Sequence, residues 1–261
     1  SMADMATAKQ VDDCWKVLEK VGVASRTTPI TYMNSSAAIK SFTGKNGGAV
    51  CTSSNTMRAM NWAFEKGEKV LFLPDQHLGR NTAILNLGLK LEDCVLWNPW
   101  KANGGLTDSE ILKAKVILWR GHCSVHGRFS LENITQMRAK VPGIQILVHP
   151  ECQHEVVSNA DVVGSTEMII KTIESSAPGS KWAIGTELNL VQRLANKFTD
   201  REVHFLDKTV CYCSTMNRID LPHLVWAMES LVSGRLVNQI SVDSETSKYA
   251  KVALERMLAL P

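Results

Sequence analysis

Short apolar runs alternate along this chain with longer segments whose apolar residues recur every three or four positions. The short runs predict β-strands at residues 30–33, 49–51, 70–73, 94–97, 116–119, 145–148, 161–163, 182–184 and 202–206. The periodic segments predict helices at residues 11–21, 55–66, 131–140, 166–175, 187–197, 221–233 and 245–258. Strands that alternate with helices in this way indicate an α/β fold with parallel sheets built from βαβ units.

Polar residues follow many of these strands at the point where each one turns toward the next helix. The strand ends read "YMNSSA", "CTSSN", "LPDQHLG", "WRGHCSVH", "VHPEC", "VGST" and "IGTE". Ser, Thr and Asn before a helix are ordinary N-caps, so one such turn carries little information. Several of them together with His, Glu and Cys favour a shared anion-binding site, because ligands bind at the carboxyl ends of parallel strands.

Composition narrows the classes of protein that this chain can be. Its 261 residues suggest about two domains, and 44% hydrophobic content is enough for a large core. The net charge of +3, without a dominant basic cluster, argues against nucleic-acid binding. No apolar run approaches the roughly 20 residues that a membrane helix needs. We therefore expect neither nucleic acid nor a membrane as a partner.

The cysteines are seven, an odd number, and they are widely scattered. This distribution favours a reducing compartment over a disulfide framework. Cys123 stands between His122 and His126 in "WRGHCSVHGRF", directly after an apolar strand. A local zinc site formed by these three residues is one interpretation. The other is that Cys123 and a distant cysteine hold a cluster, which needs no local C-x-x-C motif.

A set of motifs carries a family resemblance. In order they are "YMNSSAAIKSF", "AVCTSSNTM", "FLPDQHLGR", "WRGHCSVHGRF", "LVHPEC", "DVVGSTEMI", "IGTELNLVQRL" and "CSTMNRIDL". The set resembles quinolinate synthase, the NadA-type enzyme of NAD biosynthesis, in the family's own order. The segment 81–115, which we interpret as an insertion, and "CYCSTMNRIDLPHLVW" resemble the plant-type branch of the family.

The resemblance implies three-layer αβα domains arranged around a pseudo-threefold axis, with the active site between them. We expect residues 1–122 to be the second such domain and residues 123–212 to be the third. Residues 213–261 are then a cluster-ligand segment with helices that pack toward the first domain. That domain and its ligand cysteine are expected to be missing before Ser1, so the chain is predicted to be a fragment that is inactive alone.

The resemblance also implies a [4Fe-4S] cluster that acts as a Lewis acid. Its motifs place cluster ligands at Cys123 and Cys213, with Cys211 as the nearest rival of Cys213. Cys51 and Cys152 match no ligand position and are assigned to packing. The implied reaction condenses iminoaspartate with dihydroxyacetone phosphate to quinolinate, with loss of phosphate and two waters.

The matching motifs also assign residues to the reaction. The implied catalytic residues are Glu151, as the acid–base group, His126, His149 and Tyr32. The implied substrate-binding residues are Tyr32, Asn34, Ser53, His149, Glu151, Ser165 and Thr166. Without the resemblance, the hydroxyl residues would be N-caps and the histidines would be helix caps or hydrogen-bonded core residues.

Further expectations concern partners and location. The resemblance implies L-aspartate oxidase as the upstream enzyme that supplies iminoaspartate, sulfur-transfer machinery for cluster assembly, and room for a homodimer. A plant-type member is expected in the chloroplast stroma, and any other member in the cytoplasm. The alternatives are a zinc-dependent hydrolase that uses His122, Cys123 and His126, and a non-catalytic binding fragment.

Overall fold

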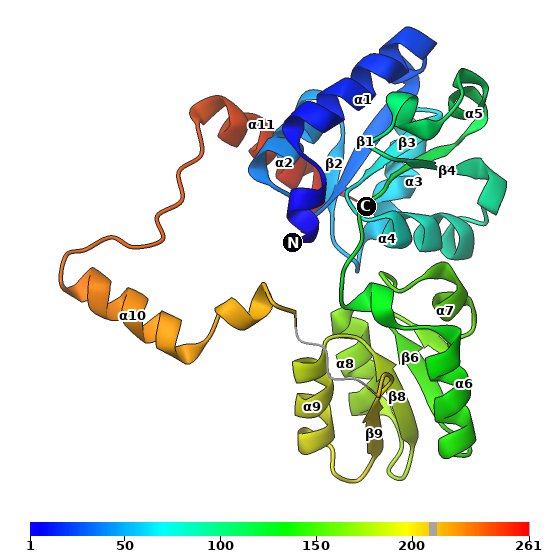
Figure 1. The fold of residues 1–261 in the computed structure, drawn as a ribbon, viewed down its shortest axis with the longest axis vertical. Helices are drawn as coiled ribbons and strands as arrows, with labels where there is room; N and C mark the ends of the chain where they lie inside the picture. Colours follow the sequence, from blue (N-terminus) through cyan, green and yellow to red (C-terminus); the bar gives the residue numbers. More distant parts are fainter. Residues whose placement is uncertain (209–212, 261) are drawn as a thin grey trace.

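The computed structural model describes residues 1–208 and 213–260. These residues form two lobes, each a parallel sheet covered by helices, and a C-terminal segment that crosses back to the first lobe (Figure 1). The expected α/β class with parallel sheets is confirmed. Strands occur at the predicted positions, with ends that differ by a few residues at most.

The first lobe contains a sheet of five described strands. They are β1 (Thr27–Tyr32), β2 (Ala49–Cys51), β3 (Lys69–Leu73), β4 (Cys94–Trp97) and β5 (Val116–Trp119), in the spatial order β2-β1-β3-β5-β4. Its helices are α1 (Ala8–Val21), α2 (Ala37–Lys45), α3 (Thr56–Lys66), α4 (Gln76–Asn81) and α5 (Asp108–Lys113).

Helices cover both faces of this sheet. Leu71 and Ile117 face the layer of α1, α2 and α5, whereas their chain neighbours Phe72 and Leu118 face α3 and α4. Side chains of successive strand residues point to opposite faces, so a strand covered on both sides becomes a continuous apolar run. This explains why the strands were visible in the sequence.

The second lobe repeats the arrangement with four described strands. They are β6 (Gln145–Val148), β7 (Val162–Val163), β8 (Lys181–Gly185) and β9 (Glu202–Phe205), in the order β7-β6-β8-β9. Helices α6 (Leu131–Lys140) and α7 (His154–Ser158) cover one face, and α8 (Thr166–Ser175) and α9 (Leu188–Lys197) cover the other.

Four helices were absent from the sequence prediction: α2, α4, α5 and α7. Helices α4, α5 and α7 have only five or six residues, too few to show a 3.6-residue period. In α2, Gly44 interrupts the pattern. A Cβ atom at this position would lie 2.0 Å from the carbonyl oxygen of Tyr249, so glycine allows the C-terminal helix to approach.

The structure also contains shorter helical turns. They lie at Met2–Met5, Ala24–Arg26, Leu91–Asp93, Ala102–Gly105, His126–Arg128 and Met216–Arg218, and a π-type turn follows α4 at Thr82–Asn86. The segment 81–115, interpreted above as an insertion, contains this turn, the edge strand β4 and α5. It is therefore part of the first lobe's sheet and of its helical cover.

The C-terminal segment carries α10 (Leu221–Val232) and α11 (Ser244–Leu258). Helix α10 stands away from both lobes (Figure 1). It carries exposed apolar side chains such as Leu224 and Trp226. Helix α11 instead packs against α2 and β2. Gly44 and the small residue Ala253 let α11 approach α2 within this chain. In the part of the chain that the structure describes, no helix combines the length and apolar character needed to cross a bilayer.

The docking of α11 leads to a prediction about stability. The Nη1 atom of Arg256 donates to the carbonyl oxygens of Gly44 at 3.0 Å and of Gly48 at 2.8 Å. Hydrogen bonds from a charged donor contribute more than neutral ones, so Arg256→Met should lower the free energy of unfolding by about 1–3 kcal/mol. Urea denaturation measures this. Lys251→Met, on the exposed face of the same helix, should cost less than about 0.5 kcal/mol; equal losses in the two variants would contradict the proposed anchor.

Candidate active site

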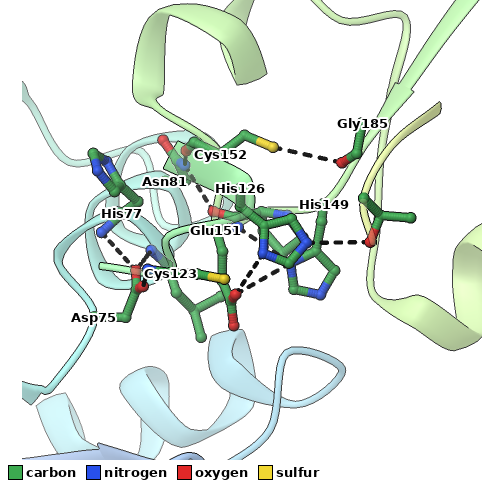
Figure 2. Close-up of polar contacts among 12 residues, drawn as sticks. Asp75, His77, Asn81, Cys123, His126, His149, Glu151, Cys152 and Gly185 are labelled. Atoms are coloured by element: carbon green, nitrogen blue, oxygen red, sulfur yellow. Dashed lines mark hydrogen bonds and ion pairs between the residues drawn. The ribbon is translucent and has the colours of Figure 1, made fainter. Parts of the chain in front are cut away.

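The carboxyl ends of strands from both sheets meet where the two lobes join. Asp75 follows β3, Cys123 follows β5, and the turn His149–Glu151 follows β6. Figure 2 shows His126 between Cys123 and His149, with Glu151 beside all three. Residues from separate loops thus form a single cluster, as the strand ends had indicated.

Cys123, His126 and Glu151 form the centre of the cluster. The candidate ligand atoms of these three residues lie within 4.8 Å of one another. Nδ1 of His126 is 2.8 Å from Oε2 of Glu151, and the other ring nitrogen, Nε2, is 3.1 Å from the hydroxyl of Thr186. The histidine ring therefore has a polar partner within reach of each nitrogen. Oε1 of Glu151 is buried and meets hydrogen-bond geometry with no described group, although the phenol of Tyr32 also contacts this carboxylate.

The charges of this cluster follow from burial and from its contacts. Burial disfavours a charged imidazole, but the contacts of His126 with Cys123 and Glu151 outweigh burial and raise its pKa to about 10. Burial favours a neutral Glu151, yet the contact with His126 outweighs this and holds the pKa of Glu151 below its usual value. The pair is thus an imidazolium and a carboxylate at neutral pH.

Two neighbouring groups stay neutral beside this pair. The ring of His149 stacks on that of His126 with 4.4 Å between centroids. Burial, and then the charge of His126, lower the pKa of His149 to about 3. Burial, and then the charge of Glu151, raise the pKa of Tyr32 well above its usual value, so its phenol keeps its proton. The site therefore combines one carboxylate, one imidazolium, one neutral imidazole and one phenol.

Asp75 positions the Cys123 loop, a role that the sequence did not assign. Its side chain is fully buried, and Oδ1 caps α4 by accepting from the backbone N–H groups of His77 and Leu78. Oδ2 accepts from the backbone N–H of Cys123 at 3.2 Å. Burial and the charge of Glu151 raise the pKa of Asp75. An acidic residue directly after a buried strand was the available signal, in "LPDQHLG".

A cleft of about 480 Å³ is lined by Ser53, Ser165 and Pro150, the residue directly before Glu151, among others. Ser165 is also the N-cap of α8, because its hydroxyl accepts from the N–H of Met168. The first turns of α3 and α8 border the cleft with residues such as Thr56 and Glu167. Free N–H groups at helix starts suit phosphate or carboxylate oxygens.

The remaining predicted site residues lie elsewhere. Asn34 and Thr166 are exposed, just beyond β1 and at the start of α8. Cys213 is half-buried and does not belong to the side-chain group of Cys123, His126 and Glu151. Its rival Cys211 lies outside the described residues. The structure therefore leaves the assignment of Cys213 as a ligand untested.

The zinc interpretation is not favoured by this geometry. His122 is exposed, and among the described residues Glu151 completes the group around Cys123 and His126 in its place. Cys51 and Cys152 are fully buried. Burial raises the pKa of Cys51 to about 12, and the thiol of Cys152 contacts the carbonyl of Gly185 at 3.6 Å.

The pKa of His126 provides a direct test of the ion pair. Glu151→Gln removes the carboxylate but keeps the contact with Cys123, so the pKa of His126 should fall below about 10. An NMR titration of metal-free protein with ¹³C-labelled histidines measures this. Glu155→Gln, on the exposed face of α7, should leave the titration unchanged. A His126 pKa that stays equally high without the Glu151 charge would show that the ion pair does not hold the proton.

Comparison with known proteins places this site in a family. A family model described as "Quinolinate synthetase A protein" matches residues 1–259. Proteins named quinolinate synthase are 68% identical in Streptomyces coelicolor, 64% in Nocardioides sp. and 53% in Rhodopirellula baltica. Each alignment covers 100% of this chain and, in the same order, 67%, 68% and 66% of the relative. The chain thus spans about two thirds of the length of these relatives.

These relatives are bacterial and align with the whole chain, including residues 81–115. The plant-type assignment and the expected chloroplast location are therefore not supported. The family resemblance itself is confirmed, and the match over residues 1–259 shows that the chain belongs to the quinolinate synthase, or NadA, family.

Proposed function

We propose that this chain supplies the catalytic group of Cys123, His126 and Glu151 to the quinolinate synthase reaction of its full-length gene product. The reaction joins iminoaspartate to dihydroxyacetone phosphate and releases phosphate and two waters. The observation that carries the proposal is the buried Glu151–His126 pair beside a cysteine thiol, in a chain that belongs to this family. Enolisation and dehydration need a group that accepts a proton and a group that returns one.

Glu151 is suited to accept protons. Its carboxylate is ionised and buried, and its Oε1 atom meets hydrogen-bond geometry with no described group. His126 carries a positive charge next to it and stabilises the ionised form. When Glu151 takes a proton, the imidazolium can pass one on, so the pair supplies both halves of an acid–base exchange. The phenol of Tyr32 and the neutral ring of His149 can donate hydrogen bonds to substrate oxygens without adding charge.

The cleft beside Pro150 is suited to the anionic ends of the substrates. Ser53 and Ser165 line it, and α3 and α8 start at its border. Hydroxyls and free N–H groups bind phosphate and carboxylate oxygens. We assign Ser53, Ser165 and Thr166 to these anionic groups, and we place Asn34, with Tyr32, at the first-lobe side of the site.

The residues around Cys123 fit a [4Fe-4S] cluster. Thiolates are the ligands that such clusters take, and Cys123 offers a half-buried thiol beside the acid–base pair. Cys213 is the second ligand that we propose from this chain. When bound, the cluster supplies an electrophilic iron that polarises a carbonyl or helps a hydroxyl leave. We further propose the lobes as domains, 1–122 and 123–212, with 213–261 as the cluster-ligand segment.

The first test of the function is the cysteine. Cys123→Ala in the full-length gene product should lose its iron, its brown iron–sulfur absorbance and quinolinate formation, the last by more than about 100-fold. Iron analysis, absorbance and a quinolinate assay measure the three effects. Cys152→Ala is the matched control, because this thiol is buried in the same region and should keep both cluster and activity. Full iron content in Cys123→Ala, or no quinolinate from the wild type, would refute the proposal.

The second test separates the role of the acid–base pair from that of the iron–sulfur cluster. Glu151→Gln keeps the size of the side chain but removes the proton acceptor, so kcat should fall by about 10²–10⁴-fold. The iron content should stay at the wild-type level, because Glu151 is not one of the proposed ligands. Glu155→Gln should retain wild-type kcat. A Glu151→Gln enzyme with normal kcat would rule out Glu151 as the acid–base group.

A further inference from the structure

We propose that Asn81 is a positioning residue that fixes the turn carrying Glu151 relative to Cys123; this inference rests on the proposed function. Asn81 is the last residue of α4 in the first lobe, and its side chain is 1% exposed. Among the described residues its hydrogen bonds go to neighbours of Glu151 and not to the acid–base pair, and it also lines the cleft. Its amide group binds the chain on both sides of Glu151.

The amide of Asn81 directs its hydrogen bonds to a single turn of the second lobe. Nδ2 donates to the carbonyl oxygen of Pro150 at 2.8 Å and to that of Cys152 at 2.9 Å. These carbonyls belong to the residues immediately before and after Glu151. Oδ1 of Asn81 lies 2.9 Å from Nδ1 of His154, at the start of α7. Both donor hydrogens and one acceptor site are therefore engaged by residues 150–154.

Helix α4 holds the other half of the site at its opposite end. Asp75, its N-cap, accepts from the backbone N–H of Cys123 at 3.2 Å. A helix of six residues thus connects the Cys123 loop at one end with the Glu151 turn at the other. Because a helix is a rigid spacer, the distance between these two loops is set by its length.

Close packing keeps α4 in place on the first sheet. Leu78 is fully buried, and a Cβ atom at Gly79 would lie 2.7 Å from side-chain atoms of both Phe72 and Leu118. The helix backbone therefore lies directly on β3 and β5. Through its hydrogen bonds, Asn81 holds the Glu151 turn of the second lobe at a fixed distance from the first sheet. A shift of the Glu151 carboxylate would lower the reaction rate although every reacting group is still present.

The experiment replaces the two donor hydrogens in the full-length, cluster-loaded gene product. Asn81→Asp keeps the shape and the acceptor for His154, but it replaces the amide nitrogen with an oxygen that faces two carbonyl oxygens. Amide hydrogen exchange of residues 149–154 should become at least about tenfold faster as the turn loosens. We expect kcat to fall by about 10–100-fold and iron content to stay constant. Asn81 also lines the cleft assigned to the anionic ends of the substrates, so the new negative charge should raise KM as well.

A matched control separates positioning from general stability. Asn46, in the first lobe, also donates its amide hydrogen to a backbone carbonyl, that of Phe42, at 2.9 Å. Asn46→Asp should lower the melting temperature while leaving kcat and the exchange of residues 149–154 at wild-type values. A loss of kcat in Asn46→Asp equal to that in Asn81→Asp would overturn the inference.

A second pair of variants covers the case in which Asn81→Asp does not fold. His154→Leu removes the contact with Oδ1 from the side of the turn, and it should also speed exchange of residues 149–154 and lower kcat. His154→Gln can still donate to Oδ1 and should restore both. Unchanged exchange in Asn81→Asp, or in His154→Leu if the former is unfolded, would refute the role of Asn81. Because exchange is measured without turnover, that result is distinct from a wild type that makes no quinolinate, which would refute the proposed function instead.

Discussion

The site depends on one buried contact, the ion pair between His126 and Glu151. Glu151 is 2% exposed, and a carboxylate at that depth takes up a proton unless a partner compensates for its lost hydration. His126 is that partner, and Thr186 fixes its other ring nitrogen. His126 lies in the segment that leads from β5 into the second lobe, and Glu151 and Thr186 follow strands of that lobe. The charge state of the site therefore requires that this segment is held against the second sheet.

Parallel sheets make such a meeting possible. The carboxyl ends of all strands in a parallel sheet lie at the same end of the sheet. The polar loops after β3 and β5 therefore gather at one end of the first sheet. The loops after β6 and β8 gather at one end of the second sheet. Where these two ends face each other, a cluster can draw its groups from loops that are far apart in the sequence. The starts of α3 and α8 border a cleft that is also lined by Pro150, the residue before Glu151.

The chemistry proposed for this site depends on neighbouring side chains that differ in their protonation state at neutral pH. His126 and His149 stack at 4.4 Å, and only one of two such close imidazoles can readily hold a charge. Contact with Glu151 directs that charge to His126, which leaves His149 neutral. Tyr32 keeps its proton because a phenolate would be buried beside a carboxylate. A proton acceptor, a proton source and neutral donors thus coexist without a large net charge, as enolisation and dehydration require.

Local pattern was sufficient to predict the strands and the longer helices, whereas the individual site residues were assigned from the family resemblance. The strands of the first sheet are covered on both faces and read as unbroken apolar runs, and Glu151, His126 and Cys123 stood in motifs at strand ends. Helix α4 was missed because six residues carry no helical period. The roles of Asp75 and Asn81 were missed for a different reason. Asp75 binds a backbone group 48 residues away, and Asn81 binds one 71 residues away. Contacts between residues so far apart in the sequence produce no local pattern from which they could be predicted. Residue type and spacing determined which reactive side chains stand at strand ends. Only the packing of the two sheets, with the carboxyl ends of their strands facing each other, decided which of these side chains touch.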